Sequence, residues 1–153
     1  MTINFKKIDK TNYQECIKLT VSDNQKNFVA TNEYSLVQVA YEEGLLPLGI
    51  YKDNKMVGFI LYDFDEDISG WSMSRFMIDI KYQNNGIGKE ALLNFIDFFK
   101  LNHGNENLYT SAEVDNIVAI KLYEKMGFEK QDLFEYTHNN KTYKEIRMLK
   151  KII

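Results

Sequence analysis

The chain has few of the residues that mark disulfide-rich, metal-binding or membrane proteins. Its 153 residues include one cysteine, one proline and two histidines. A single cysteine, Cys16, excludes an internal disulfide and fits a reducing compartment, so we expect a cytoplasmic location. His103 and His138 stand apart without ligand spacing, so we predict no metal site. No apolar run approaches the length of about 18 residues that a membrane span needs, so we predict no membrane partner.

The chain also lacks a strong excess of positive or negative residues, since its formal net charge is −3. A nucleic-acid surface has a basic patch, so this balance predicts no nucleic-acid partner. Hydrophobic residues make up 44% of the chain, which predicts a packed globular fold rather than disorder. The length suits one domain with a single core, and we expect residues 1–153 to form it.

Apolar periodicity and turn residues predict an alternation of strands and helices. Expected strands are 3–8, 48–51, 56–64, 71–79, 107–114, 128–137 and 142–149. The first expected helix has Asp9, Thr11 or Asn12 as its cap and runs to about Thr20, and the other expected helices are 35–43, 88–101 and 116–126. The order is β-α-α-β-β-β-α-β-α-β-β. It predicts the α/β class, with an α+β mixed sheet that has antiparallel strands on its N-terminal side.

A glycine-containing loop lies between the strand 71–79 and the long helix 88–101. The loop reads Gln83, Asn84, Asn85, Gly86, Ile87, Gly88 and Lys89. Backbone N–H groups and the positive dipole end of a helix N-terminus can bind a phosphate-like anion. The loop lacks the spacing of a Walker or dinucleotide-binding motif, and by itself it is also compatible with a simple strand-to-helix turn.

A second segment narrows the interpretation. It contains Asn116, Ala119, Leu122, Tyr123, Lys125, Gly127 and Phe128 in the pattern N-x-x-A-x-x-L-Y-x-K-x-G-F. Together with Gln83, Gly86 and Gly88, it resembles the GNAT family of N-acetyltransferases, whose acyl-CoA loop is written Q/R-x-x-G-x-G/A. The element order of the whole chain is similar to that of the family as well.

The sequence departs from the family pattern at two positions. Ile80 stands where many members have proline, and Asn84 stands where many have glycine. Because asparagine tolerates left-handed backbone angles, we expect the loop to keep its shape. Further segments around Ser22, Pro47 and Arg75 are similar to the diamine (spermine/spermidine) N-acetyltransferases of bacilli.

The resemblance implies acetyl-CoA as co-substrate. The loop residues 83–89 would bind its pyrophosphate through backbone N–H groups. The backbone at Met77 and Ile78 would pair with the pantetheine arm, and the Ile78 N–H would serve as an oxyanion donor. Asn116 would bind the same arm, and it can also cap its helix, since the two roles are compatible. The resemblance also implies that Tyr123 and Lys125 contact the cofactor.

Tyr123 is the predicted catalytic residue, because the matching phenol of the family protonates the departing thiolate. The residue also shares a helix face with Ala119, Leu122 and Met126, so the alternative is a core tyrosine. A buried tyrosine needs a partner for its hydroxyl, and the CoA sulfur could supply one.

The acceptor must lose a proton before it attacks. A primary alkylamine has a pKa of about 10.4, so its free base costs roughly 4–5 kcal/mol at pH 7. Glu113 is the predicted base, and Glu33 is a second candidate that we place with the substrate-binding residues. Either carboxylate could instead be solvated. Asp63, with Asp65, Glu66 and Asp67, could attract a polycation or form a plain hairpin loop.

Some aromatic residues could line an amine site and contact the amine through cation–π interactions, or they could belong to the core. They include Trp71, Tyr34 and Phe28. The sequence thus predicts an N-acetyltransferase that acts on a small-molecule amine such as spermidine by direct attack in a ternary complex. The alternatives are a protein N-terminus, an aminoglycoside or an amino acid as acceptor, or a non-catalytic acyl-CoA-binding regulator. A homodimer is expected from the family resemblance alone.

Overall fold

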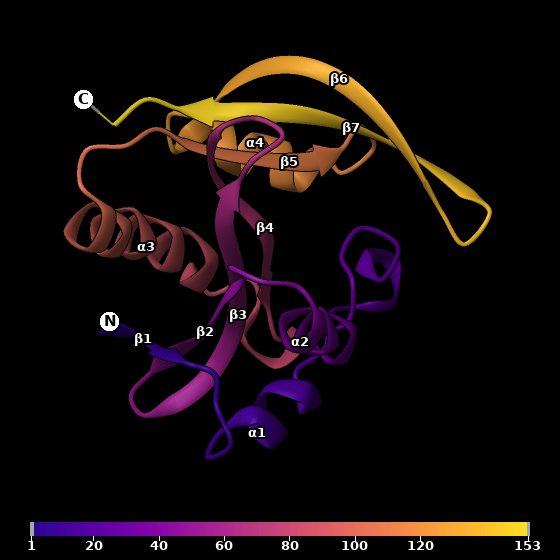
Figure 1. Ribbon diagram of the computed structural model, residues 1–153. Coiled ribbons are helices and arrows are strands. Elements are labelled where there is room, and N and C mark those ends of the chain that lie inside the picture. Colours follow the sequence, from indigo (N-terminus) through magenta and orange to yellow (C-terminus); the bar gives the residue numbers. More distant parts are fainter. Residues whose placement is uncertain (1, 153) are drawn as a thin grey trace.

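The computed structural model describes residues 2–152, which form a 7-stranded mixed sheet with helices on both faces (Figure 1). The strands are β1 (Ile3–Lys7), β2 (Leu46–Lys52), β3 (Lys55–Asp65), β4 (Gly70–Ile78), β5 (Leu108–Glu113), β6 (Glu129–His138) and β7 (Lys141–Lys150). The helices are α1 (Tyr13–Lys18), α2 (Asn32–Tyr41), α3 (Ile87–His103) and α4 (Ile117–Lys125), with two short 3₁₀ helices, η1 (Asp23–Gln25) and η2 (Ile80–Tyr82).

The sheet consists of two antiparallel parts that meet at one parallel pair. The strand order is β1-β2-β3-β4-β5-β7-β6, and β1 to β4 form an antiparallel meander. β4 and β5 run parallel, and α3 connects them. This arrangement confirms the predicted mixed sheet, its element order and the position of its antiparallel strands.

Each face of the sheet has its own hydrophobic cluster. One cluster joins the sheet to α3 and α4, with Phe95, Phe99 and Tyr123 among its members. The other joins β2 and β3 to α1 and α2 and includes the buried Cys16. Cys16 is therefore a core residue in this fold, and burial raises the pKa of its thiol to about 12.

The structure differs from the sequence prediction mainly at element ends. α2 begins at Asn32 rather than 35, because the Thr31 hydroxyl accepts a hydrogen bond from the Tyr34 N–H and caps the helix. α3 buries one face, with Phe95 and Phe99 in the core, whereas Leu101 near its end is 87% exposed. The two 3₁₀ helices were not expected.

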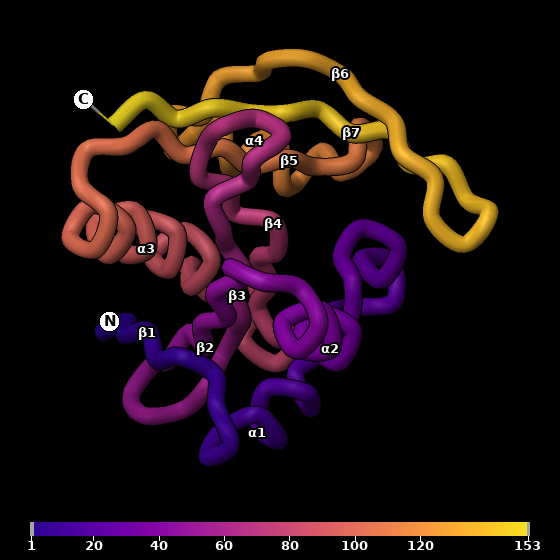
Figure 2. Tube along the Cα trace, viewed as in Figure 1, coloured from indigo at the N-terminus to yellow at the C-terminus, as the bar shows by residue number. Residues whose placement is uncertain are grey.

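The β6–β7 hairpin extends well beyond the rest of the sheet (Figures 1 and 2). Its tip curves toward the segment that contains η1 and the start of α2, far away in sequence. The rings of Tyr34 on α2 and His138 on β6 lie 5.7 Å apart, centroid to centroid. The hairpin and α2 therefore meet on the face of the sheet opposite α3.

Candidate active site

A gap in the sheet begins where β4 and β5 stop pairing. The two strands are in register only from the Trp71–Leu108 pair to the Met73–Thr110 pair. On the other side of β4, Leu61 pairs with Arg75 and Tyr62 with Met73, which leaves Ser74 as a bulge residue. The bulge bends β4 away from β5, so its last residues have no β5 partner.

Backbone alternation directs one N–H group of β4 into this gap. The Asp79 N–H donates to the Val57 carbonyl of the neighbouring β3 at 2.8 Å. In an antiparallel pair every second residue faces the partner strand, so Met77 faces β3 while Ile78 faces the gap. The Ile78 carbonyl confirms this direction, because it accepts a hydrogen bond from Gln83 at 2.9 Å. Of the two predicted backbone contacts, the geometry therefore favours Ile78.

The N-terminus of α3 opens beside the same gap. Gly86 is its N-cap, with φ +76°, and supplies no side-chain cap. The first intrahelical bond runs from the Glu90 N–H to the Gly86 carbonyl, so the N–H groups of Ile87, Gly88 and Lys89 precede the helical ladder. A 17-residue helix that begins in this way has the features of an anion-binding site.

Asn84 takes a left-handed backbone conformation, with φ +66°. This conformation suits the glycine that many family members have, and asparagine tolerates it better than most residues do. The Gln83 side chain donates to the Ile78 carbonyl and to the Gln25 side chain, each at 2.9 Å. Gln83 thus ties the loop to β4 and to the segment near η1.

α4 brings Asn116 and Tyr123 to the opposite wall of the gap. The Asn116 side chain accepts a hydrogen bond from the Ala119 N–H and caps α4, which is the alternative considered for it. Tyr123 is 6% exposed and packs on Phe128. Burial raises the pKa of its phenol to about 12, and the neighbouring Thr110 hydroxyl partly opposes this shift. The phenol is therefore protonated near pH 7 and can donate a proton.

The central cavity, of about 790 Å³, occupies the gap and continues to the face that carries α2 and the hairpin. Its lining includes predicted residues from both motifs and from the aromatic set: Phe28, Tyr34, Met77, Ile78, Gln83, Asn84, Gly88, Glu113, Asn116 and Tyr123. Residues 85–87, 89 and 125 do not line it. The structure therefore brings the two sequence motifs together around one space.

The carboxylates of the cavity belong to Glu113 on β5 and Glu145 on β7, which are paired across the two strands. Glu145 was not expected from the sequence. One of its oxygens accepts a hydrogen bond from the Ser111 hydroxyl at 2.8 Å, and the other accepts one from the Tyr136 hydroxyl at 2.7 Å. Burial, and then the charge of Glu145, raise the pKa of the Glu113 carboxyl.

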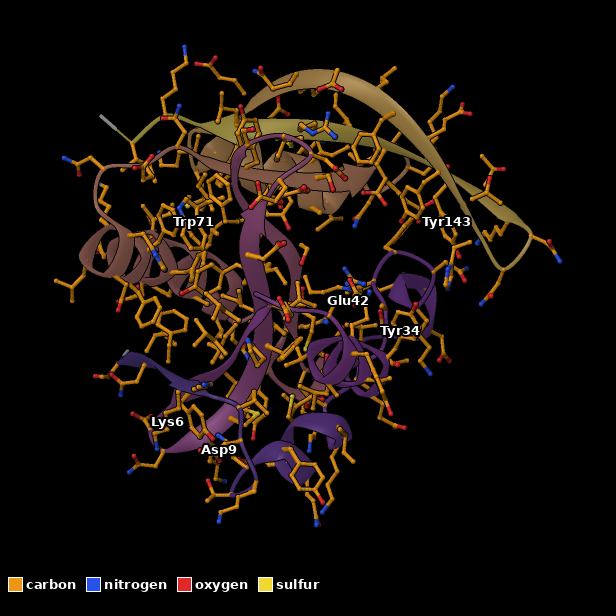
Figure 3. The ribbon with its side chains drawn as sticks, in the orientation of Figure 1. Lys6, Asp9, Tyr34, Glu42, Trp71 and Tyr143 are labelled. Carbon is orange, nitrogen blue, oxygen red and sulfur yellow. The ribbon has the colours of Figure 1, made fainter. Side chains whose placement is uncertain are left out.

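Three predicted substrate-binding residues lie outside the central cavity. Trp71 packs on the α3 face, with its ring 4.0 Å from that of His103, and Figure 3 shows it across the sheet from Tyr34 and Tyr143. Asp63 is half-buried on β3, where burial and then Asp65 raise the pKa of its carboxyl. Glu33 is exposed in the first turn of α2. Strand alternation explains the position of Trp71, because its side chain points to the face that carries α3 and away from the central cavity.

Within residues 2–152, no helix is long and apolar enough to cross a membrane. The same residues contain no group of three or more histidine, cysteine, aspartate or glutamate side chains placed to hold a metal ion.

The site combines a helix N-terminus suited to an anion, a gap between two parallel strands and a buried phenol. These features suit a long phosphorylated thioester, so the fold and the site define an acyl-CoA-dependent transferase. Residues 10–128 match the family model described as "Acetyltransferase (GNAT) family". The chain belongs to this family and is an acetyl-CoA-dependent N-acetyltransferase that transfers acetyl to an amine.

The chain is similar to known proteins over nearly its whole length. It is 29% identical over 153 residues to a spermine/spermidine N(1)-acetyltransferase of Bacillus subtilis, covering 95% of this chain and 100% of that protein. The ribosomal-protein-S18-alanine N-acetyltransferase of Escherichia coli is 18% identical with a TM-score of 0.72, covering 99% and 94% of the two chains. A Bacillus subtilis acetyltransferase solved with CoA is 16% identical with a TM-score of 0.70, covering 99% and 100%.

Proposed function

We propose that the chain acetylates a primary amine of a polyamine such as spermidine or spermine, by direct attack on acetyl-CoA in a ternary complex. The observation that carries this proposal is the placement of Glu113, Glu145 and the protonated phenol of Tyr123 around one cavity. Carboxylates attract an ammonium group, and a phenol beside the gap can protonate a leaving thiolate.

The proposed binding of acetyl-CoA uses the groups at the gap. N–H groups of residues 83–89 hold the pyrophosphate, as the uncapped start of α3 suggests. The Ile78 N–H, which faces the gap, donates to the thioester oxygen when negative charge develops there. The Asn116 side-chain amide contacts the pantetheine arm while its oxygen caps α4.

The proposed transfer balances two protons. The free amine attacks the thioester carbonyl carbon, the new C–N bond forms, and the C–S bond breaks as the thiolate leaves. Glu113 receives the proton that the amine loses, directly or through water, and its raised pKa suits a base. Tyr123 donates its phenolic proton to the sulfur and later regains one from solvent.

A polyamine acceptor is favoured by the composition of the cavity and by the 29% identity to a spermine/spermidine N(1)-acetyltransferase. Tyr34, Tyr136 and Tyr143 line the cavity near its two carboxylates. Aromatic faces and carboxylates together bind alkylammonium groups.

A second candidate acceptor is an amine that also carries a carboxylate, such as an amino acid or a peptide N-terminus. Arg75 favours it, because its guanidinium lines the cavity and is held by the Gln38 side chain at 2.9 Å and the Ser74 carbonyl at 3.2 Å. A cation fixed at this position can bind an anionic group of the acceptor.

The test is thiol release from acetyl-CoA against a panel of spermine, spermidine, free amino acids, an alanine-terminated peptide and an aminoglycoside. We expect the largest kcat/KM with the polyamines. A higher value for an amino acid or the peptide would replace the polyamine with the second candidate. Thiol release with none of these acceptors, despite acetyl-CoA binding, would contradict the proposed acceptor class altogether.

A further inference from the structure

We propose that Glu145 binds the second, non-reacting ammonium group of a diamine or polyamine and so selects polycationic acceptors over monoamines. This inference rests on the proposed function. It assigns Glu145 a role distinct from that of Glu113, the proposed base, although the two residues are direct neighbours across β5 and β7.

The position of Glu145 is set by alternation along β5. Thr110 is buried and bonds to the Met73 carbonyl, on the side where Tyr123 also lies. Ser111, the next residue, points to the opposite face and donates to Glu145. Glu145 therefore lies on the opposite face of the sheet from Tyr123, on the side of the cavity where α2 and the β6–β7 hairpin meet.

The Glu145 carboxylate is held in place without a cationic partner. Its two oxygens accept hydrogen bonds from two neutral hydroxyls, those of Ser111 and Tyr136. Among residues 2–152, the ion pairs are Lys26–Asp23, Lys81–Asp79 and Arg147–Asp132, and none includes Glu145. A carboxylate oriented by neutral donors keeps its charge available for a ligand cation.

None of the nearby cations pairs with Glu145 in the described residues. Arg147, two residues along β7, pairs with Asp132 and covers the Phe134 ring. Lys141 lies over the Tyr143 ring, 5.0 Å from its centroid, and lowers the pKa of Glu113. Arg75 acts on Tyr136 by its charge, yet its guanidinium is held by Gln38.

Aromatic rings complete the subsite. Tyr136 stacks on Tyr143 with a centroid separation of 5.1 Å, and both line the cavity. Tyr34 closes the space from α2 through its contact with His138. An alkylammonium group between these rings and Glu145 gains both ionic and cation–π contacts.

The experiment compares 1,4-diaminobutane with butylamine, which differ by one ammonium group. Wild-type enzyme should favour the diamine in kcat/KM, and Glu145→Gln should reduce this ratio about tenfold or more through KM, because a charge-assisted hydrogen bond is lost. The KM for acetyl-CoA should not change. Glu135→Gln is the matched control, since Glu135 is exposed on β6 opposite Lys144 and outside the cavity lining.

Tyr136→Phe is the second variant, and it removes one hydrogen bond to Glu145 while leaving the charge in place. It should lower the same ratio about threefold, so the inference stays testable even if Glu145→Gln does not fold. A diamine-to-monoamine ratio that stays within about twofold of wild type in a folded variant would overturn the role of Glu145. Wild-type enzyme that releases no thiol with spermidine, spermine or either of these amines would instead count against the proposed function.

Discussion

Replacement of Tyr123 by phenylalanine tests the proposed leaving-group acid most directly. The variant removes one hydroxyl and keeps the ring that packs 5.6 Å from the Phe128 ring. General acid catalysis contributes about 10²- to 10⁴-fold, which corresponds to roughly 3–5 kcal/mol of activation free energy. We therefore expect kcat to fall by about that factor, with the affinity for acetyl-CoA unchanged within about twofold.

The change in stability should be much smaller than the change in rate. Tyr123 is 6% exposed, and the lost hydroxyl contributes about one hydrogen bond, or about 1 kcal/mol of unfolding free energy. Steady-state thiol release gives kcat, calorimetric titration gives the acetyl-CoA Kd, and urea unfolding gives the stability.

Tyr51→Phe is the matched control. Tyr51 is 5% exposed, its hydroxyl accepts a hydrogen bond from Asn12, and it lies on β2 outside the cavity lining. It should lose a similar unfolding free energy with no loss of kcat. A Tyr123→Phe enzyme with kcat within twofold of wild type, or a loss explained by weaker acetyl-CoA binding, would refute the reasoning.

Three further predictions concern the loop, the pH profile and a buried carboxylate. Gly86→Ala should lower the unfolding free energy by about 1–2 kcal/mol and weaken acetyl-CoA binding, because the backbone φ at Gly86 is +76°. Asn84→Gly should change neither quantity much, because asparagine already adopts a positive φ there. Equal losses for the two variants in urea unfolding and in acetyl-CoA titration would contradict this prediction. The kcat at saturating amine should fall on acidification with a midpoint above the usual glutamate pKa of about 4.3, because Glu113 must be deprotonated and its pKa is raised. No alkaline loss from Tyr123 should occur below about pH 11, since its pKa is about 12; a decline near pH 9 that Tyr123→Phe abolishes would show the phenol to be more acidic. Asp79→Ala should lower the unfolding free energy, measured with urea, by about 2 kcal/mol. The reason is that the Asp79 side chain is 1% exposed and accepts a hydrogen bond from the Thr20 N–H at 2.8 Å. A loss below about 0.5 kcal/mol would show that water replaces the carboxylate as the acceptor.

Local patterns were enough to predict the elements and both binding motifs. Glycine and asparagine at 84–88 mark the helix start, and the Asn116–Phe128 pattern places a cap and a tyrosine on one helix. These features depend on neighbours within a few residues, which is why the sequence could reveal them. The family resemblance that the two motifs carried is confirmed by the family match.

The lining of the central cavity near β7 depended on contacts between distant segments. Whether Trp71 faces the cavity or the α3 helix depends on the alternation and bulge of β4, which no local pattern specifies. Glu145 reaches the cavity because β7 pairs with β5, more than thirty residues earlier in the chain, and because Ser111 and Tyr136 orient its carboxylate.

The sequence by itself therefore determined the family, the glycine loop before α3 and the tyrosine of α4, since the loop and the tyrosine each lie within one short motif and the two motifs together identify the family. Only the tertiary structure decided which carboxylates and aromatic rings line the central cavity. Strand pairing and strand separation bring those side chains together, and both are set by the packing of the whole sheet.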